Sequence, residues 1–351
     1  MTILGWHHIT LVCADAARTV DFYTRILGLR FIKKTVNFDA PDSYHIYFGN
    51  YEGTPGSAIT FFEWGNAPRG AAGIGGTHHF ALQVPDRNAL LKWKRWLHDH
   101  AVRVDGIYNR KYFESIYFRD PDGCIVELAT NTPGFTVDEA PESLGTVHQP
   151  PPPELTARHR DAEAIAAEMW AEPIEAITPD MALTRGLHHI SAICSDIQRT
   201  HAYYGELFGL RLVKMTEDFD NLGAPHWYWG VGEGAPGTLI TYFERPSGSR
   251  RAQIGTGQTH HFAFGLPNAE VQLEWREKLI AAGLSVSPVM ERVYFKSIYT
   301  RDPDGHIVEL ATVDPGFAVD EPLEALGSTL RLPPWLEPQR ALIESSLPPL
   351  P

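Results

Sequence analysis

The stretch Arg119–Thr130, RDPDGCIVELAT, recurs almost unchanged as RDPDGHIVELAT at Arg301–Thr312. In each copy an Asp-Pro-Asp-Gly turn leads into an apolar run that is typical of a buried strand. Side chains alternate across a strand, so Glu127 and Glu309 each share one face with an isoleucine and an alanine. An ionised carboxylate in that position must be paired, bind a cation or become neutral. The sequence therefore predicts the same buried acidic group twice.

The repeat covers most of the 351 residues. GWHHITLVCAD, residues 5–15, aligns with GLHHISAICSD, residues 186–196, so that His8 and His189 are 181 residues apart (189 − 8). His79 and His261 are 182 residues apart (261 − 79). The segments PGFTVDE from Pro133 and PGFAVDE from Pro315 also match. A repeat of this length indicates an internal duplication.

A second, weaker repetition lies inside each half. A strand that begins with His-His leads to an amphipathic helix and then to further strands, and the pattern starts again at a second His-His. In the first copy Asp15 is suited to cap the helix and Gly28 to end it. We therefore expect an α+β fold of four βαβββ modules.

Four consecutive prolines, Pro150 to Pro153, mark a boundary between the halves, and the helix-like segment 154–170 follows them. The expected division is residues 1–150, with two modules and the start of a linker, and residues 151–351, with a linker helix, two modules and a C-terminal tail. The sequence leaves open whether modules 1 and 4 pair, and 2 and 3, or whether pairing occurs within each half.

Strand parity separates the members of each His-His pair. The first member shares its face with bulky apolar residues, whereas the second shares it with small ones, so the second should face an open, concave surface. These second members are His8, His79, His189 and His261. A lone strand histidine is usually a satisfied core residue, and a strand glutamate can lie at a sheet edge. The joint pattern favours a metal site, since two histidines and a carboxylate form the facial triad of non-haem iron(II).

Composition limits the partners. A net charge of −13 without a dense Lys/Arg block argues against nucleic acid or an anionic membrane as a partner. Three cysteines without a C-x-x-C pair suggest neither disulfides nor a thiolate site, and no apolar stretch is long enough to span a bilayer. We expect a cytoplasmic protein with a small aromatic substrate, and a homo-oligomer is compatible with this composition.

These motifs resemble the vicinal oxygen chelate superfamily, which includes glyoxalases, fosfomycin-resistance transferases and extradiol dioxygenases. HHIT, YHIYFGN, EGTPG, NRKYFESIYFRDPDG and PGFTVDE are similar to the ring-cleaving dioxygenases that act on hydroquinones. The resemblance implies two paired, open-barrel domains and an iron(II) held by His8, His261 and Glu309. It also implies roles beside the metal for five further residues: His7, Thr10, His260, Arg292 and Tyr299.

The chain departs from that pattern because a second set is complete. His79, Glu127 and His189 could hold another metal, with Arg110 and Tyr117 matching Arg292 and Tyr299. If modules paired within each half, the same six ligands would instead form the sets His8/His79/Glu127 and His189/His261/Glu309.

The resemblance implies a metal-dependent ring-cleaving dioxygenase with extradiol-type insertion of O2 into a hydroquinone or catechol-like ring. Iron(II) is the expected cofactor, manganese(II) the next choice, and zinc or nickel are less favoured. His260 or His7 would accept a substrate proton, and Tyr299 or Arg292 would stabilise developing charge.

Three alternatives stay open. A fosfomycin-type transferase uses the same ligand types. A metal-free small-molecule binding protein would not need the triads. A glyoxalase-like isomerase is implied to need a fourth carboxylate, at positions where this chain has Ile59 and Ile240.

Overall fold

The computed structural model describes residues 2–350 and divides into two compact units. The first unit contains the chain up to Ala71 together with the chain from Gln253 onward, and the second spans Ala72–Ala252. Within residues 2–350, no helix has both the length and the apolar character that a bilayer crossing requires.

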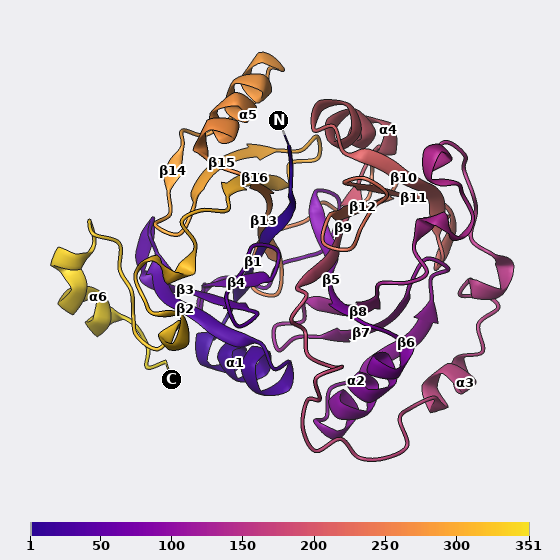
Figure 1. Ribbon diagram of the computed structural model, residues 1–351, viewed down its shortest axis with the longest axis horizontal. Helices are drawn as coiled ribbons and strands as arrows, with labels where there is room; N and C mark the ends of the chain where they lie inside the picture. The colour runs from indigo at the N-terminus through magenta and orange to yellow at the C-terminus, as the bar shows by residue number, and fades with distance from the viewer. Residues whose placement is uncertain (1, 351) are drawn as a thin grey trace. The chain divides into compact units, whose positions relative to one another are not determined.

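The sheet of the first unit joins modules 1 and 4 (Figure 1). Its order is β14-β15-β16-β13-β1-β4-β3-β2, and β1 runs antiparallel to β13 at the centre. The strands are β1 (Gly5–Cys13), β2 (Arg30–Asn37), β3 (Ala40–Gly49), β4 (Ala58–Glu63), β13 (Thr259–Leu266), β14 (Met290–Glu291), β15 (Lys296–Arg301) and β16 (Ile307–Thr312).

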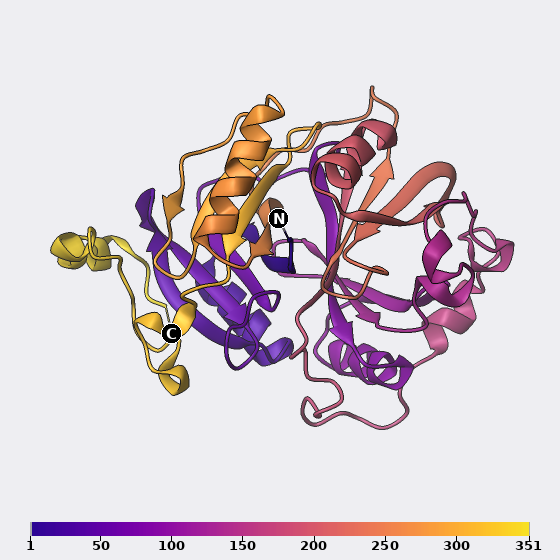
Figure 2. The same ribbon diagram turned by 45° about the horizontal axis from the view of Figure 1, so that its top comes forward.

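The sheet of the second unit joins modules 2 and 3 in the order β10-β11-β12-β9-β5-β8-β7-β6. Figure 2 shows that each sheet curls, as expected for an open half barrel. The strands are β5 (Gly76–Val84), β6 (Val104–Asn109), β7 (Glu114–Arg119), β8 (Ile125–Thr130), β9 (Leu187–Cys194), β10 (Arg211–Asp218), β11 (Asn221–Gly230) and β12 (Leu239–Glu244).

The topology decides the pairing that the sequence left open, because β1 pairs with β13 and β5 with β9. The predicted division near residue 150 does not coincide with the compact units. Residue 150 lies inside the second unit, whose two modules come from different halves of the chain. The prolines mark the end of the first sequence repeat. The compact units are instead defined by strand pairing between a module of the first repeat and a module of the second.

Helices cover the outer faces of the sheets. The first is α1 (Ala16–Asp21), where Asp15 accepts a hydrogen bond from the Arg18 amide, and Gly28 has φ +68° just beyond the π-helical continuation. Linker helix α3 (Ala162–Ala167) is shorter than expected from residues 154–170, because Asp161 caps it and turns precede it. The other α-helices are α2 (Arg87–Asp99), α4 (Ile197–His201), α5 (Ala269–Ala281) and α6 (Arg340–Ser346).

Short helical turns complete the secondary structure. Two π-helical segments, η1 (Phe22–Ile26) and η5 (Ala202–Leu207), extend α1 and α4. The 3-10 turns are η2 (Phe135–Val137), η3 (Pro141–Ser143), η4 (Pro153–Leu155), η6 (Phe317–Val319), η7 (Leu323–Ala325) and η8 (Glu337–Gln339).

A buried lysine ties each tail to the neighbouring module of its own unit. Lys33 of β2 is fully buried, and its Nζ donates to the Phe317 carbonyl (3.0 Å), to Asp320 (2.7 Å) and to Glu321. Lys214 of β10 has the matching role with Asp138 and Glu139. A buried ammonium needs such partners, so the tails that follow modules 4 and 2 are held against modules 1 and 3.

Candidate metal centres

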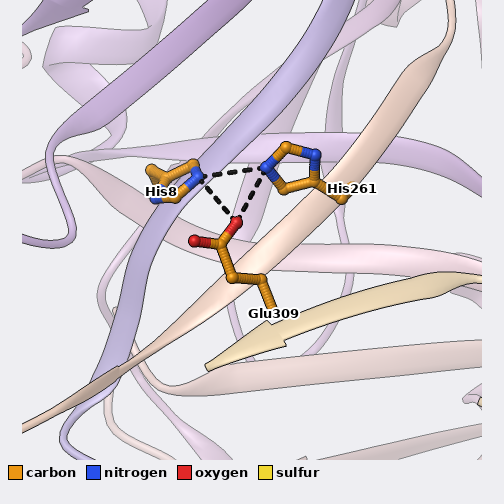
Figure 3. A group of neighbouring side chains, drawn as sticks. All are labelled: His8, His261 and Glu309. Carbon is orange, nitrogen blue, oxygen red and sulfur yellow. Dashed lines mark hydrogen bonds and ion pairs between the residues drawn. The ribbon is translucent and has the colours of Figure 1, made fainter. Parts of the chain in front are cut away.

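The first triad consists of His8 on β1, His261 on β13 and Glu309 on β16, and the three side chains converge on one point (Figure 3). The Nε2 atoms of the two histidines are 3.2 Å apart. Oε2 of Glu309 lies 3.3 Å from Nε2 of His8 and 2.9 Å from Nε2 of His261. Glu309 is fully buried, and both histidines are nearly so.

The second triad repeats this arrangement in the other unit with His79 on β5, His189 on β9 and Glu127 on β8. Oε2 of Glu127 lies 2.8 Å from Nε2 of His79 and 3.3 Å from Nε2 of His189. The two Nε2 atoms are 3.2 Å apart. The pairing of modules 1 with 4 and 2 with 3 therefore brings the six predicted residues together as the two sets that this pairing implied.

The donor atoms fit a divalent metal. Three ligands that meet at right angles on one ion, with bonds of about 2.1 Å, lie about 3.0 Å apart, which matches both triads. Ser297 and Ser115 donate to Oε1 of Glu309 and Glu127 respectively. In both carboxylates the buried Oε2 has no hydrogen-bond donor among the described residues and faces only the two imidazoles. One oxygen is thus held by serine and the other is left for a cation.

Burial alone would raise the pKa of Glu309, but the adjacent His8 and His261 hold it well below its usual range. The carboxyl is therefore ionised at neutral pH. His261 itself has its pKa lowered, chiefly by burial, which favours the neutral imidazole that a metal requires.

β-Bulges place the first histidine of each pair. In β1, Trp6 pairs with Phe264 and His8 with Ala263, so His7 is the extra residue of a bulge. The register shifts in the same way around His78, His188 and His260. Parity predicted these residues on the helix-covered face. Parity did not predict that each first ring contacts the ring of the second histidine, as the bulges allow.

The contact made by each bulge fixes the orientation of a triad imidazole. Nδ1 of His7 lies 2.8 Å from Nδ1 of His8, and the same contact joins His260 to His261 at 2.8 Å. Burial and the neighbouring His8 lower the pKa of His7 to about 3, so the His7 ring is neutral, and in this contact one of the two Nδ1 atoms must donate to the other. If His8 donates from Nδ1, its Nε2 lone pair points to the centre of the triad.

A pocket opens onto the first triad, with about 350 Å³ of empty space that is partly open to solvent. Predicted residues Arg292 and Tyr299 line it, and Nε of Arg292 lies 3.4 Å from the Tyr299 hydroxyl. Tyr299 is directly opposite Glu309 on the neighbouring strand. Its burial raises the pKa of its hydroxyl, so the group stays protonated and can donate. His7 and His260 lie behind the triad imidazoles and are not among the lining residues.

The sequence prediction missed most of the pocket wall. His45 lines the pocket together with Asn37, Phe38, Asp39, Tyr47, Phe62 and Phe295. The only signal was that His45 and His226 match across the duplication. His45 also lies in the segment YHIYFGN, one of those that carry the resemblance, but the resemblance implied no role for it.

Predicted residue Thr10 belongs to a buried hydrogen-bond chain that ends at the pocket. Its hydroxyl lies 2.8 Å from that of Thr60, which in turn is 2.9 Å from Nε2 of His45. Nδ1 of His45 is 2.9 Å from the hydroxyl of Tyr47. Thr10 thus supports the pocket wall through His45 and does not line the pocket itself.

The fourth carboxylate of an isomerase is absent from the inner face of β4. Phe62 lines the pocket, Thr60 on the same face of the strand contacts Thr10 and His45, and Ile59 alternates to the other side. The nearest acidic residue of the strand, Glu63, accepts a hydrogen bond from the Ala16 amide at 2.9 Å and so caps α1.

The sequence model of the Glyoxalase/Bleomycin resistance protein/Dioxygenase superfamily matches residues 5–128 and 186–310. Over the full length of both chains, the protein is 32% identical to "Putative ring-cleaving dioxygenase MhqA" of Bacillus subtilis. It is 29% identical to "Chlorohydroquinone/hydroquinone 1,2-dioxygenase" of Sphingobium indicum, covering 95% of this chain and 92% of that one.

Solved structures of related proteins have the same fold. The crystal structure of a "putative dioxygenase" from Bacillus subtilis matches with a TM-score of 0.80 and 31% identity, over 100% of this chain and 98% of that one. Glyoxalase I from Zea mays shares the fold, with a TM-score of 0.58 and 15% identity over 88% and 92% of the two chains. The duplicated modules, the paired triads and these likenesses together place the chain in the Glyoxalase/Bleomycin resistance protein/Dioxygenase superfamily, among its ring-cleaving dioxygenases.

Proposed function

We propose that this chain adds both atoms of O2 to a hydroquinone or catechol-like ring and opens that ring, with iron(II) held by His8, His261 and Glu309. The observation that carries the proposal is Oε2 of Glu309, a buried carboxylate oxygen that has no hydrogen-bond donor among residues 2–350 and lies within 3.3 Å of two imidazole nitrogens. Manganese(II) suits the same donors, and the lack of a fourth carboxylate on the inner face of β4 argues against the isomerase chemistry of a glyoxalase.

A bound divalent iron would lower the pKa of a substrate hydroxyl and give O2 a site beside the ring. The protein supplies the rest. Phe38, Phe62 and Phe295 form aromatic walls that can hold a flat ring. The Tyr299 hydroxyl and the Arg292 guanidinium face the same space as the triad, and both can donate to oxygens on which negative charge develops.

The buried histidines have an orienting role in this proposal. His7 and His260 each contact a triad imidazole through Nδ1, so they set which nitrogen is free to bind the metal. Neither lines the pocket, which argues against direct proton transfer from the substrate. His45 and Tyr47 do line the pocket, and Nδ1 of His45 lies 2.9 Å from the Tyr47 hydroxyl.

The second triad is proposed as a second metal site of the same kind. Its donor distances repeat those of the first, and Ser115 holds Glu127 as Ser297 holds Glu309. A metal-free binding protein has no reason to bury two such carboxylates without donors.

The direct test is oxygen consumption by protein loaded anaerobically with iron(II). With hydroquinone we expect one O2 consumed per ring, and with ¹⁸O2 a product heavier by both labelled atoms, detected by mass spectrometry. The metal-free protein serves as the control. Product without the label, or no oxygen uptake by iron-loaded protein with hydroquinones and catechols, would contradict the proposal.

Replacement of Tyr299 by phenylalanine should lower kcat about 10- to 100-fold, because it removes one hydrogen donor aimed at developing charge. Iron content should not change, since Tyr299 is not a triad member. The matched control is Tyr117→Phe, the equivalent position in the other unit, which should leave hydroquinone turnover at the first triad intact. Steady-state oxygen uptake with elemental analysis measures both. Loss of iron on Tyr299→Phe would instead assign the residue a structural role.

A further inference from the structure

The surroundings of the two triads match at most positions across the duplication. Arg110 and Tyr117 stand where the first unit has Arg292 and Tyr299, and Asp220 stands where it has Asp39. In both units the arginine forms an ion pair with the aspartate, at 3.2 Å for Arg110 and 3.1 Å for Arg292. Asp39 lines the pocket of the first triad, so Asp220 is expected to lie near the second triad in the same way. We call the arginine and the aspartate of such a pair the rim of their triad.

The linker adds a cation to the second rim. Nη2 of Arg160 forms an ion pair with Asp220, and Nε donates to the Leu155 carbonyl at 2.9 Å. Its guanidinium carbon lies 4.7 Å from the ring centre of Tyr108, and that of Arg110 lies 5.1 Å from the same ring. Arg160 is thus held by the linker backbone and by a rim aromatic, and it shares one carboxylate with Arg110.

The two rims therefore differ in charge. At the first, Arg292 and Asp39 balance. At the second, Arg110 and Arg160 face the single carboxylate of Asp220. The second unit has one further ion pair, Arg245 with Asp218 at 2.8 Å, whose charges cancel. The equivalent residues of the first unit are the uncharged Trp64 and Asn37. Asp105, which also lies near Tyr108, is itself paired with Arg103 at 3.6 Å. Among these arginines and aspartates, the second unit therefore has one more positive charge than the first.

The extra guanidinium still has capacity to bind. Among residues 2–350, Nη1 of Arg160 has no hydrogen-bond partner, although the side chain is only 12% exposed. Arg110 lies between this group and the triad, with its guanidinium carbon 5.4 Å from the Tyr117 ring, and Tyr117 packs edge-on against His79 at 5.6 Å. A guanidinium held in place beside aromatic rings is well suited to a carboxylate on a flat substrate.

We infer that the second triad serves an aromatic substrate that carries a carboxylate, whereas the first serves an uncharged hydroquinone. The inference rests on the proposed function and adds a division of substrates between the two centres. Arg160 is its specificity-determining residue. Opposite charge near a partly buried site favours the anionic ligand, and we expect a preference of about tenfold at low ionic strength.

The test uses two full-length variants that each keep one triad, Glu309→Gln for the second and Glu127→Gln for the first. Both are loaded anaerobically with iron(II), and elemental analysis counts the metal. Anaerobic calorimetry then compares hydroquinone with 2,5-dihydroxybenzoate, the same ring with a carboxylate. We expect the Glu309→Gln protein to bind the anion about tenfold more tightly than hydroquinone, and the Glu127→Gln protein to lack this preference.

Arg160→Gln in the Glu309→Gln background should abolish the preference, and Arg160→Lys, which keeps the charge, should retain most of it. Arg340→Gln is the control for loss of a tail arginine, because Arg340 pairs with Glu337 and Glu344 in the other unit. Equal affinities for the two ligands, or no effect of Arg160→Gln in a protein that melts normally, would overturn the inference.

The two proposals fail in different ways. If the Glu309→Gln protein binds no iron while the Glu127→Gln protein consumes oxygen with hydroquinone, the substrate division is wrong and the proposed function stands. If both variants bind iron and both ligands but neither consumes oxygen with either, the proposed function is wrong, whatever the affinities.

Discussion

Replacement of Glu309 by glutamine is expected to remove the metal from the first triad and to lower hydroquinone turnover by at least about a thousandfold. The amide keeps the size of the side chain, and its oxygen can still accept from Ser297. It removes the one carboxylate of a buried set whose other members are the imidazoles of His8 and His261. A divalent cation in so enclosed a site then lacks its counter-charge.

Metal content measured by elemental mass spectrometry, alongside oxygen uptake, separates the outcomes. We expect two metals per chain in the unaltered protein, one after Glu309→Gln, one after Glu127→Gln and none in the double variant. Glu63→Gln is a matched control, since Glu63 lies in the same unit but caps α1. Two metals per chain and unchanged hydroquinone turnover in the Glu309→Gln protein would exclude His8, His261 and Glu309 as the active centre.

The six triad residues could be predicted from the sequence because the histidines and the glutamates each show a distinct pattern. The second histidine of every pair has small neighbours of the same parity, and each glutamate interrupts an otherwise apolar strand. The structure brings all six together. The pairing could not be predicted, because the four modules have nearly equivalent edges and the choice depends on contacts between strands such as β1 and β13 that are distant in sequence.

Other features leave no periodic mark. Parity assumes a regular strand, and the bulges at His7 and His260 break that assumption, so the contacts of the first histidines with the triad imidazoles were not predicted. The side chain of His45 is held at the pocket by a hydrogen bond to Thr60 of the adjacent strand. Local sequence patterns do not predict such a contact between strands. The linker position Arg160 has no counterpart in the strand repeat, and it was not predicted to lie near either triad.

Lys33 is the second residue at which a large effect is expected, here on stability. Replacement by methionine keeps most of the side-chain volume but removes the ammonium that Asp320 and Glu321 surround. Glu321 is only 3% exposed and would lose its main counter-charge, although Arg331 lies 3.4 Å away. Breaking a buried ion pair from one side costs about 3–5 kcal/mol of unfolding free energy.

Denaturant unfolding followed by fluorescence measures the loss, with Lys34→Met as the neighbouring control. The Lys34 ammonium donates to the Leu350 carbonyl at 2.6 Å in a partly buried position, so we expect a loss below about 1 kcal/mol. Equal losses for the two variants would show that Lys33 acts through its aliphatic stem alone.

A second substitution distinguishes the loss of an attraction from the exposure of an unpaired charge. If the cost of Lys33→Met comes mainly from the buried carboxylate left behind, Glu321→Gln in the same chain should recover part of the stability, although it adds no new contact. If the cost comes from detachment of the C-terminal tail, Glu321→Gln should recover none of the lost unfolding free energy. The tail contributes Phe317, which packs against Tyr47 of the pocket wall at 5.2 Å. In the second case hydroquinone affinity should therefore fall along with stability, whereas in the first the pocket should keep its affinity.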